Sequence, residues 1–348
     1  MSKYFQVVTV SGSPYERGYQ HGQVFGEQIR SFLADNVARI NIVRKDKISL
    51  EQALSMVDGY ISFIERDVPD IAEEIRGLAE GAQITYREAM LLQVRRELIS
   101  RGLECSALGY VDQEEGAIIA QNVDLPGNLT ELGIILKIKS SVPGEPSIMM
   151  YTHIGLLGYL GVNSYGIGIG LNMVLAPGWR EGVPPYLLIR HLLHQRNLKD
   201  CLREIRRIRR TSSRNLLLSD GHRVLDIEMT VEDERFIEQQ LIVHTNHYLN
   251  NEFRQIDQIS PSTSTFLRLE RMHSLAAHYD NKPSLQQIQE LLKDHTNYPR
   301  SICAHGQGDY SRGETVASVI LYPKKGVMYA AKGYPCENQF YRYLLFEE

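Results

Sequence analysis

The chain has 348 residues, a formal net charge of −4, and 43% hydrophobic and 23% charged residues, as in ordinary globular proteins. This charge gives no reason to expect nucleic acid or an anionic membrane as a partner, and no apolar run approaches the length that spans a bilayer. The four cysteines are too few and too scattered for a disulfide framework, and no signal-peptide pattern precedes the first strand-like run. We therefore expect a cytoplasmic protein.

The first hundred residues have mainly helical patterns. A strand over 5–10 leads into Gly12-Ser13-Pro14, in which Ser13 can cap a helix and Pro14 can occupy its first position. The helix predicted over 15–33 carries glycine at every fourth position, at Gly18, Gly22 and Gly26, so we expect another backbone to pack closely there. Apolar residues at spacings of three and four predict further helices from Ser49 onward, over 71–82 and over 86–100.

Beyond residue 104 the pattern changes to short strands broken by Gly and Asn. Strands are predicted over 109–111, 117–122, 133–139, 147–152, 156–160, 166–171, 215–219, 224–229, 241–244, 315–321 and 326–331. Helices are predicted over 185–193, 198–209, 264–278 and 285–293. Many consecutive strands favour a largely antiparallel sheet, and the absence of a long linker argues against separate domains.

Cys105 stands at the boundary between the helical and strand-rich parts. It is followed by Ser106 and Ala107, a context that suits a new N-terminus better than core packing. One interpretation is that the bond between Glu104 and Cys105 is cut and that Cys105 then acts as an N-terminal nucleophile; the other is a small buried filler. From the residues alone, both interpretations remain open.

Polar residues at strand ends are the other candidates. Asn122 and Asp124 end a strand that pairs back toward Cys105, although Asp124 can equally cap a turn before Pro126. The run from His244 to His247 also follows a strand, but two histidines three apart there point to opposite faces, and no third ligand has a recognisable spacing. We therefore expect no metal.

Two further patterns have ordinary explanations. Cys303 and His305 resemble a thiol–imidazole pair, but such pairs come from distant segments of a chain. The basic run over 203–210 carries an apolar stripe, so its arginines are expected to be the solvated sides of a helix.

Taken together, these motifs resemble the acyl-coenzyme A:6-aminopenicillanic acid acyltransferase family of N-terminal-nucleophile hydrolases. The similarity rests on the order and spacing of seven segments: 12–22, Cys105-Ser106, 121–124, 155–164, 244–247, 297–303 and 311–313. A more remote similarity is to the choloylglycine hydrolase and penicillin V acylase group. The resemblance implies an α+β fold, a four-layer αββα sandwich, with autoproteolytic activation and transfer or hydrolysis of an acyl group.

The resemblance also implies roles for individual residues. Cys105 matches the nucleophile, Asp124 an aspartate near its freed amine, and Asn246 an asparagine that stabilises the oxyanion. Ser311 and Arg312 match a Ser-Arg pair near the active site. Cleavage between Glu104 and Cys105 would give a helical fragment 1–104 and a strand-rich fragment 105–348, which we expect to stay associated as one globular unit.

The expected function is that of an amidohydrolase or acyltransferase without a cofactor, acting on a small-molecule acyl amide or, as an alternative substrate, an acyl-CoA. Two other functions stay open: an uncut binding protein with a silent Cys105, and a conventional thiol hydrolase that depends on His305 or His247.

Overall fold

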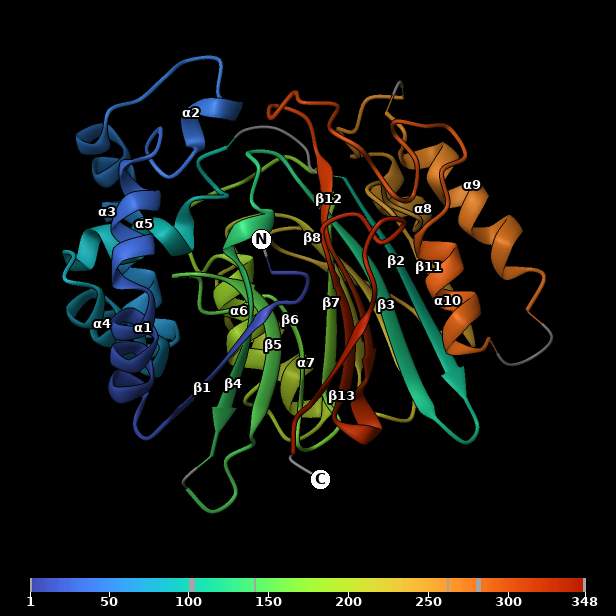
Figure 1. Cartoon of the computed structure of the whole chain (residues 1–348), viewed down its shortest axis with the longest axis horizontal. Coiled ribbons are helices and arrows are strands. Elements are labelled where there is room, and N and C mark those ends of the chain that lie inside the picture. The colour runs from blue at the N-terminus through green and yellow to red at the C-terminus, as the bar shows by residue number, and fades with distance from the viewer. Residues whose placement is uncertain (1, 100–103, 141, 262, 280–282, 347–348) are drawn as a thin grey trace.

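Two β-sheets lie face to face between two sets of helices in the computed structural model, which describes residues 2–99, 104–140, 142–261, 263–279 and 283–346. Helices α1 to α5 gather on one side and α9 and α10 on the other, with the strands between them (Figure 1). This arrangement is the four-layer α+β sandwich that the resemblance implied. No helix in the described part of the chain is long and apolar enough to cross a membrane.

The helices and short 3-10 turns of the described residues alternate with groups of strands along the chain. They are α1 (Pro14–Ala34), α2 (Ile40–Val43), α3 (Leu50–Asp67), α4 (Pro69–Ala82), α5 (Tyr86–Val94), η1 (Thr130–Leu132), α6 (Pro185–Leu192), α7 (Leu198–Arg207), α8 (Asn251–Arg254), α9 (Thr265–Ala276), α10 (Leu285–Leu292) and η2 (Pro323–Lys325).

The larger sheet has the strand order β1-β4-β5-β6-β7-β8-β9-β10 and the smaller sheet has the order β11-β2-β3-β12-β13-β14. The strands are β1 (Gln6–Ser11), β2 (Glu104–Asp112), β3 (Gly116–Leu125), β4 (Gly133–Lys139), β5 (Ile148–His153), β6 (Leu160–Asn163), β7 (Gly168–Met173), β8 (Arg214–Ser219), β9 (Val224–Met229), β10 (Glu234–Ile237), β11 (Leu241–His244), β12 (Glu314–Tyr322), β13 (Val327–Lys332) and β14 (Tyr341–Leu344). All their pairings are antiparallel except that of β1 with β4, which joins the N-terminal segment to the larger sheet.

The glycine face of α1 packs against α4. A Cβ atom added to Gly18 would lie 1.8 Å from the carbonyl oxygen of Glu74, and one added to Gly22 would lie 2.4 Å from that of Leu78. Gly77 and Gly81 of α4 face α1 equally closely. The close approach predicted from the glycine spacing is confirmed, and both helices begin with a proline at their first turn.

Several predicted boundaries were wrong. The helix predicted over 86–100 ends at Val94, because the described residues after it form turns. The strand predicted over 156–160 starts only at Leu160; before it, the backbone N–H groups of Gly155 and Leu157 donate to side chains of His21 and Gln93 instead of to a neighbouring strand. The short edge strands β10 and β14 were not predicted.

Candidate active site

Cys105 lies near the start of β2, inside the sandwich. Cys105 is 3% exposed, and it pairs with Val123 of β3. Because neighbouring residues of a strand face opposite sides of a sheet, Ser106 and its partner Asn122 face the layer of α9 and α10, whereas Cys105 faces the larger sheet. The helix-to-strand junction predicted from the sequence therefore places a thiol between the two sheets.

Asn246 holds the backbone nitrogen of Cys105. The Cys105 N–H donates to Asn246 Oδ1 over 2.8 Å, and Asn246 Nδ2 donates to the carbonyl oxygen of Met173 over 3.0 Å. Since a backbone N–H can only donate and a backbone carbonyl can only accept, these two contacts fix which way the amide points. In the uncut chain the side-chain oxygen of Asn246 thus accepts a hydrogen bond from the nitrogen that cleavage would free.

Arg268 of α9 is a central residue of the site that the sequence did not suggest. Its guanidinium donates to the carbonyl oxygen of Cys105 over 2.7 Å, to Ser106 Oγ over 2.8 Å and to Asn246 Oδ1 over 2.8 Å. The residue is 1% exposed. Its three contacts join Cys105, Ser106 and Asn246 into one hydrogen-bonded unit.

Asp124 stands one position beyond the register partner of Cys105. It pairs with Glu104 across the strands, and its carboxylate Oδ1 accepts a 2.6 Å hydrogen bond from Thr315 Oγ1 of β12. The negative charge of Asp124 raises the pKa of the Cys105 thiol, and its backbone N–H lowers that pKa. The residue therefore affects the thiol and also binds the neighbouring strand.

The side chain of Asn122 binds the layer of α9 and α10. Its Nδ2 donates to the carbonyl oxygens of Leu292 and Ile302, each over 2.8 Å, and its Oδ1 accepts from Ser318 Oγ. These bonds brace the strand against α10 and the segment after it. The amide predicted to serve the site is thus already engaged on the helix-facing side of the sheet.

The Cys105 thiol is protonated at neutral pH in the uncut chain. Burial and then the negative charge of Asp124 raise its pKa to about 12, against the opposing effects of the Asp124 backbone N–H and the positive charges of Arg268 and Arg96. A thiol in this state needs a base before it can attack a carbonyl group.

A narrow cavity of about 20 Å³ is linked to this thiol through two of its lining residues, although Cys105 does not itself line it. Arg96 and Tyr159, which both interact electrostatically with Cys105, are among its lining residues. The complete lining consists of Phe32, Leu92, Arg95, Arg96, Leu125, Leu129, Leu132, His153, Ile154, Leu156, Tyr159 and Tyr186. Because about 10–15 Å³ of such volume accommodates one water molecule, the cavity of the uncut chain holds no acyl group without opening.

Two adjacent arginines give this otherwise apolar and aromatic cavity its charge. Arg95 and Arg96 are 5% and 6% exposed, and within the described ranges neither forms an ion pair with a carboxylate. Arg95 Nη2 and Arg96 Nε and Nη1 have no hydrogen-bond partner among the described residues. Burial, reinforced by the charge of Arg96, lowers the pKa of Arg95 to about 9. Such groups favour a negatively charged ligand.

Ser311 and Arg312 lie apart from the Cys105 group on an exposed loop. Ser311 Oγ donates to Asp309 Oδ1 over 2.7 Å, and Arg312 Nε lies 2.9 Å from Asp309 Oδ2. Among the contacts of the described residues, none joins either side chain to Cys105. Their assignment to the active site stays a prediction from the resemblance.

His244, the last residue of β11, and His247, three residues later, point to different partners, as expected. His244 Nε2 lies 3.0 Å from Glu228 Oε1 and its Nδ1 lies 2.9 Å from the carbonyl oxygen of Thr245, so both ring nitrogens face acceptors. His247 instead contacts Thr265 Oγ1 over 2.9 Å. Neither of these contacts supplies a base to the Cys105 thiol.

Comparisons with known proteins agree with the resemblance. A sequence model described as acyl-coenzyme A:6-aminopenicillanic acid acyl-transferase matches residues 111–336. The acyl-coenzyme A:6-aminopenicillanic-acid-acyltransferase 40 kDa form of Emericella nidulans is 28% identical over 328 residues, covering 90% of this chain and 88% of that protein.

Two solved structures show a weaker similarity. Penicillin V acylase from Agrobacterium tumefaciens is 11% identical with a TM-score of 0.44, covering 66% of this chain and 83% of that chain. A variant of conjugated bile acid hydrolase from Clostridium perfringens is 9% identical with a TM-score of 0.47, covering 70% of this chain and 99% of that chain.

Proposed function

Since the chain belongs to the acyl-coenzyme A:6-aminopenicillanic acid acyl-transferase family, we propose that it is an enzyme that cuts its own Glu104–Cys105 bond and then uses Cys105 as an N-terminal nucleophile. Amidohydrolase or acyltransferase activity follows from the family. The observation that carries the finer proposal is the hydrogen bond from the Cys105 nitrogen to Asn246, which holds the nitrogen that the cut would release.

Self-cleavage begins with attack of the Cys105 sulfur on the carbonyl carbon of Glu104. The thiol proton moves to the nitrogen of Cys105 as the peptide bond breaks, which leaves a thioester between Glu104 and the sulfur. Water then hydrolyses the thioester, so that Glu104 gains a carboxylate and Cys105 regains its thiol beside a free α-amine. The Arg268 bond to the carbonyl oxygen of Cys105 supports this step by fixing the peptide unit that follows the scissile bond.

The new amine supplies the base that the uncut chain lacks. An N-terminal amine has an ordinary pKa of about 7.7–8.0, so an appreciable fraction is neutral near pH 7 and can accept the thiol proton. Asn246 Oδ1 is placed to hold this amine, and the carboxylate of Asp124 is the neighbouring charge that favours its protonated form. These two contacts would set the position and the charge of the base.

Turnover follows N-terminal thiol chemistry. The thiolate attacks the acyl carbonyl of an amide or thioester, the leaving amine or thiol takes the proton from the α-amine, and an acyl-thioester forms on Cys105. Water or an acceptor amine then takes the acyl group. From the resemblance, Asn246 donates to the oxyanion, an effect of about 3–4 kcal/mol, while Ser311 and Arg312 belong near the site.

The acyl group would occupy the cavity that Arg96 and Tyr159 line. Aromatic and aliphatic side chains line most of it, and Arg95 and Arg96 supply unpaired donors, so we propose an acyl group with an apolar stem and a negatively charged end. Opening of the cavity is part of this proposal, because its volume in the uncut chain is too small.

The intact mass of the purified protein tests self-cleavage. We expect fragments 1–104 and 105–348, held together because β1 of the first fragment pairs with β4 of the second. Cys105→Ala should stay as one chain, with Cys201→Ala as the matched control at another buried cysteine. A wild-type chain that remains whole after prolonged incubation would favour the silent binding protein, and cleavage of Cys105→Ala at the same bond would exclude Cys105 as the nucleophile.

The fate of the acyl group is a separate proposal. An acceptor amine competes with water at about 55 M only if a dedicated pocket raises its effective concentration. We propose that hydrolysis of linear N-acyl amides is at least as fast as transfer from an acyl-CoA to 6-aminopenicillanic acid. Incubation of the cleaved protein with each substrate set, followed by product quantification, decides between them.

A further inference from the structure

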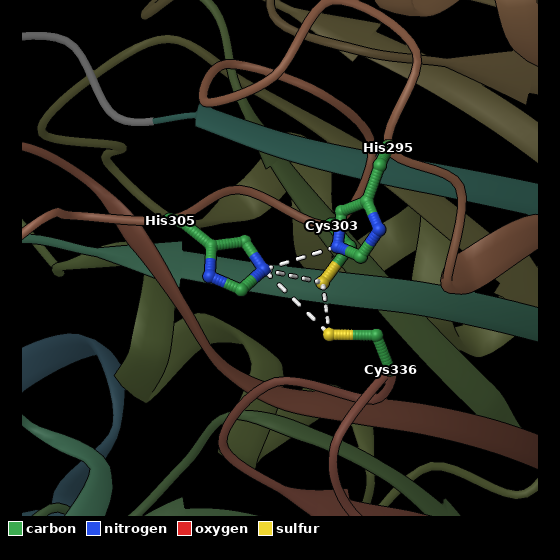
Figure 2. Close-up of side chains that lie close together, drawn as sticks. All are labelled: His295, Cys303, His305 and Cys336. Carbon is green, nitrogen blue, oxygen red and sulfur yellow. Dashed lines mark hydrogen bonds between the residues drawn. The ribbon is translucent and has the colours of Figure 1, made fainter.

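Four side chains that could hold a metal ion gather where the segment between α10 and β12 meets the segment between β13 and β14. His295, Cys303, His305 and Cys336 each direct one ligand atom toward a common centre, and these atoms all lie within 4.8 Å of one another (Figure 2). Cys303 is fully buried, His305 and Cys336 are half-buried, and His295 is exposed. From the sequence we expected no metal: that argument concerned His244 and His247, and Cys303 and His305 were considered only as a thiol–imidazole pair.

Four of the six distances between the ligand atoms are close to the edges of a tetrahedron around zinc, and the two from His295 to the sulfurs are within 4.8 Å. With Zn–S bonds of about 2.3 Å and Zn–N bonds of about 2.0–2.1 Å, the edges are about 3.8 Å for S···S, 3.6 Å for S···N and 3.4 Å for N···N. The observed distances are 3.7 Å between the sulfurs, 3.6 Å from His305 Nε2 to each sulfur and 3.1 Å between the two Nε2 atoms.

Hydrogen bonds alone do not account for this cluster. His305 Nε2 faces both sulfurs and His295 Nε2 at once, as the dashed lines in Figure 2 show. A single ring nitrogen offers either one proton or one lone pair, so it satisfies only one of these three contacts. A cation at the centre would accept a lone pair from all four atoms together.

A disulfide is not present in this arrangement. The Cys303 and Cys336 sulfurs are 3.7 Å apart, compared with about 2.03–2.05 Å in a disulfide bond. Two thiolates and two imidazoles are a donor set typical of structural zinc.

We propose that His295, Cys303, His305 and Cys336 bind one structural zinc ion. Four protein ligands leave no open position for water or substrate, so the ion holds the fold rather than performing chemistry. It would join the segment between α10 and β12 to the segment after β13. The ring of His305 is already oriented by stacking on Tyr334, with a centroid distance of 3.9 Å.

The proposed zinc lies close to the active-site network. Ala304, between two of the ligands, donates its backbone N–H to Thr315 Oγ1 over 2.9 Å, and that hydroxyl donates to Asp124 Oδ1 over 2.6 Å. Zinc binding therefore fixes the backbone that supports Thr315, and through it the carboxylate next to Cys105.

Metal analysis of the untagged full chain tests the proposal directly. After gel filtration in buffer without chelator, mass spectrometry of the metals should find about one zinc per chain. In His295→Ala and in Cys336→Ser, the zinc content per chain should fall by about tenfold or more. The matched controls, His278→Ala at another exposed histidine and Cys201→Ser at another buried cysteine, should keep the wild-type content.

A spectroscopic measurement on the wild type does not depend on the folding of any variant. Cobalt(II) added to the reduced, metal-stripped chain should give the intense visible bands of a tetrahedral site and thiolate-to-cobalt charge transfer. Wild-type protein that contains no zinc and gives no such bands would overturn the proposal. So would a native Cys303–Cys336 disulfide in peptide mapping, or another metal at full occupancy.

Discussion

The backbone nitrogen of Cys105 and the side-chain oxygen of Asn246 are 2.8 Å apart in the uncut chain. The contact joins the start of β2 to the residues after β11, two strands that pair in the smaller sheet. The same oxygen also accepts from Arg268, so Asn246 joins the helix α9 to the nitrogen that the proposed cleavage would release. On that proposal, the site of the amine is formed before cleavage.

Asn246→Ala should lower kcat of the cleaved enzyme by about 10²–10³, the range for loss of one oxyanion donor. Asn246→Asp keeps an acceptor oxygen for the Cys105 nitrogen but removes the NH₂ donor, so we expect a similar loss. Kinetics with a linear N-acyl amide measures both, with the exposed Asn197→Ala as control. Nearly wild-type turnover of Asn246→Asp would show that Asn246 does not donate to the oxyanion and only accepts a hydrogen bond from the Cys105 nitrogen.

Arg268→Met should slow self-cleavage by about tenfold or more, since it removes charge-assisted hydrogen bonds to Cys105 and Asn246 that are typically worth about 1.5–3 kcal/mol each. Arg268→Lys keeps the charge and should recover part of the rate. Intact mass over time gives the rate, and thermal melting checks the fold.

The control for this experiment lies one turn along the same helix. Arg271→Met breaks a partly exposed ion pair with Asp294 and leaves the Cys105 contacts in place, so its cleavage should follow the wild type. Equal rates for Arg268→Met and Arg271→Met would remove Arg268 from the processing machinery.

Much of the architecture could be predicted from local patterns. The capping residue Ser13, the glycine face of α1 and the strand-rich part after Cys105 all follow from short-range physics, and the layered fold followed from the resemblance. Strand ends were less predictable, because side chains of His21 and Gln93 satisfy backbone groups that a strand would otherwise pair.

The residues that the sequence did not suggest owe their positions to long-range packing. Arg268 looks like an ordinary helical arginine, and only the packing of α9 against β2 and β11 brings it to Cys105. Cys336 likewise meets Cys303 only because the segments flanking β12 and β13 converge. Neither contact can be predicted from the spacing of residues along the sequence.

Arg96→Gln should weaken binding of substrates with a negatively charged acyl end, raising KM by about tenfold or more with little change in kcat. Neutral acyl amides should be nearly unaffected, because they offer the guanidinium no charge. The exposed Arg87→Gln on the preceding helix is the control. Equal KM changes for charged and neutral substrates would show that Arg96 does not recognise an anionic group.

Buried His244 should make the stability of the fold depend on pH. Burial alone would lower its pKa, but the charge of Asp226 and the hydrogen bond and charge of Glu228 raise it above 6.5. Both ring nitrogens face acceptors, which favours the doubly protonated ring. A raised pKa in the folded state means that this stabilisation is complete below the unfolded value of about 6.5 and is lost as pH rises through the folded value.

His244→Gln in the uncut Cys105→Ala background should therefore cost most in unfolding free energy near about pH 6, and progressively less toward about pH 9. Glu228 does not reverse this trend. Burial raises the pKa of Glu228, but the hydrogen bond with His244 and the other contacts of this carboxylate together outweigh burial and lower that pKa, so Glu228 stays charged across this pH window. Urea unfolding at several pH values measures the difference, with exposed His278→Gln as control. A destabilisation that grows as the pH rises would contradict a protonated, ion-paired His244.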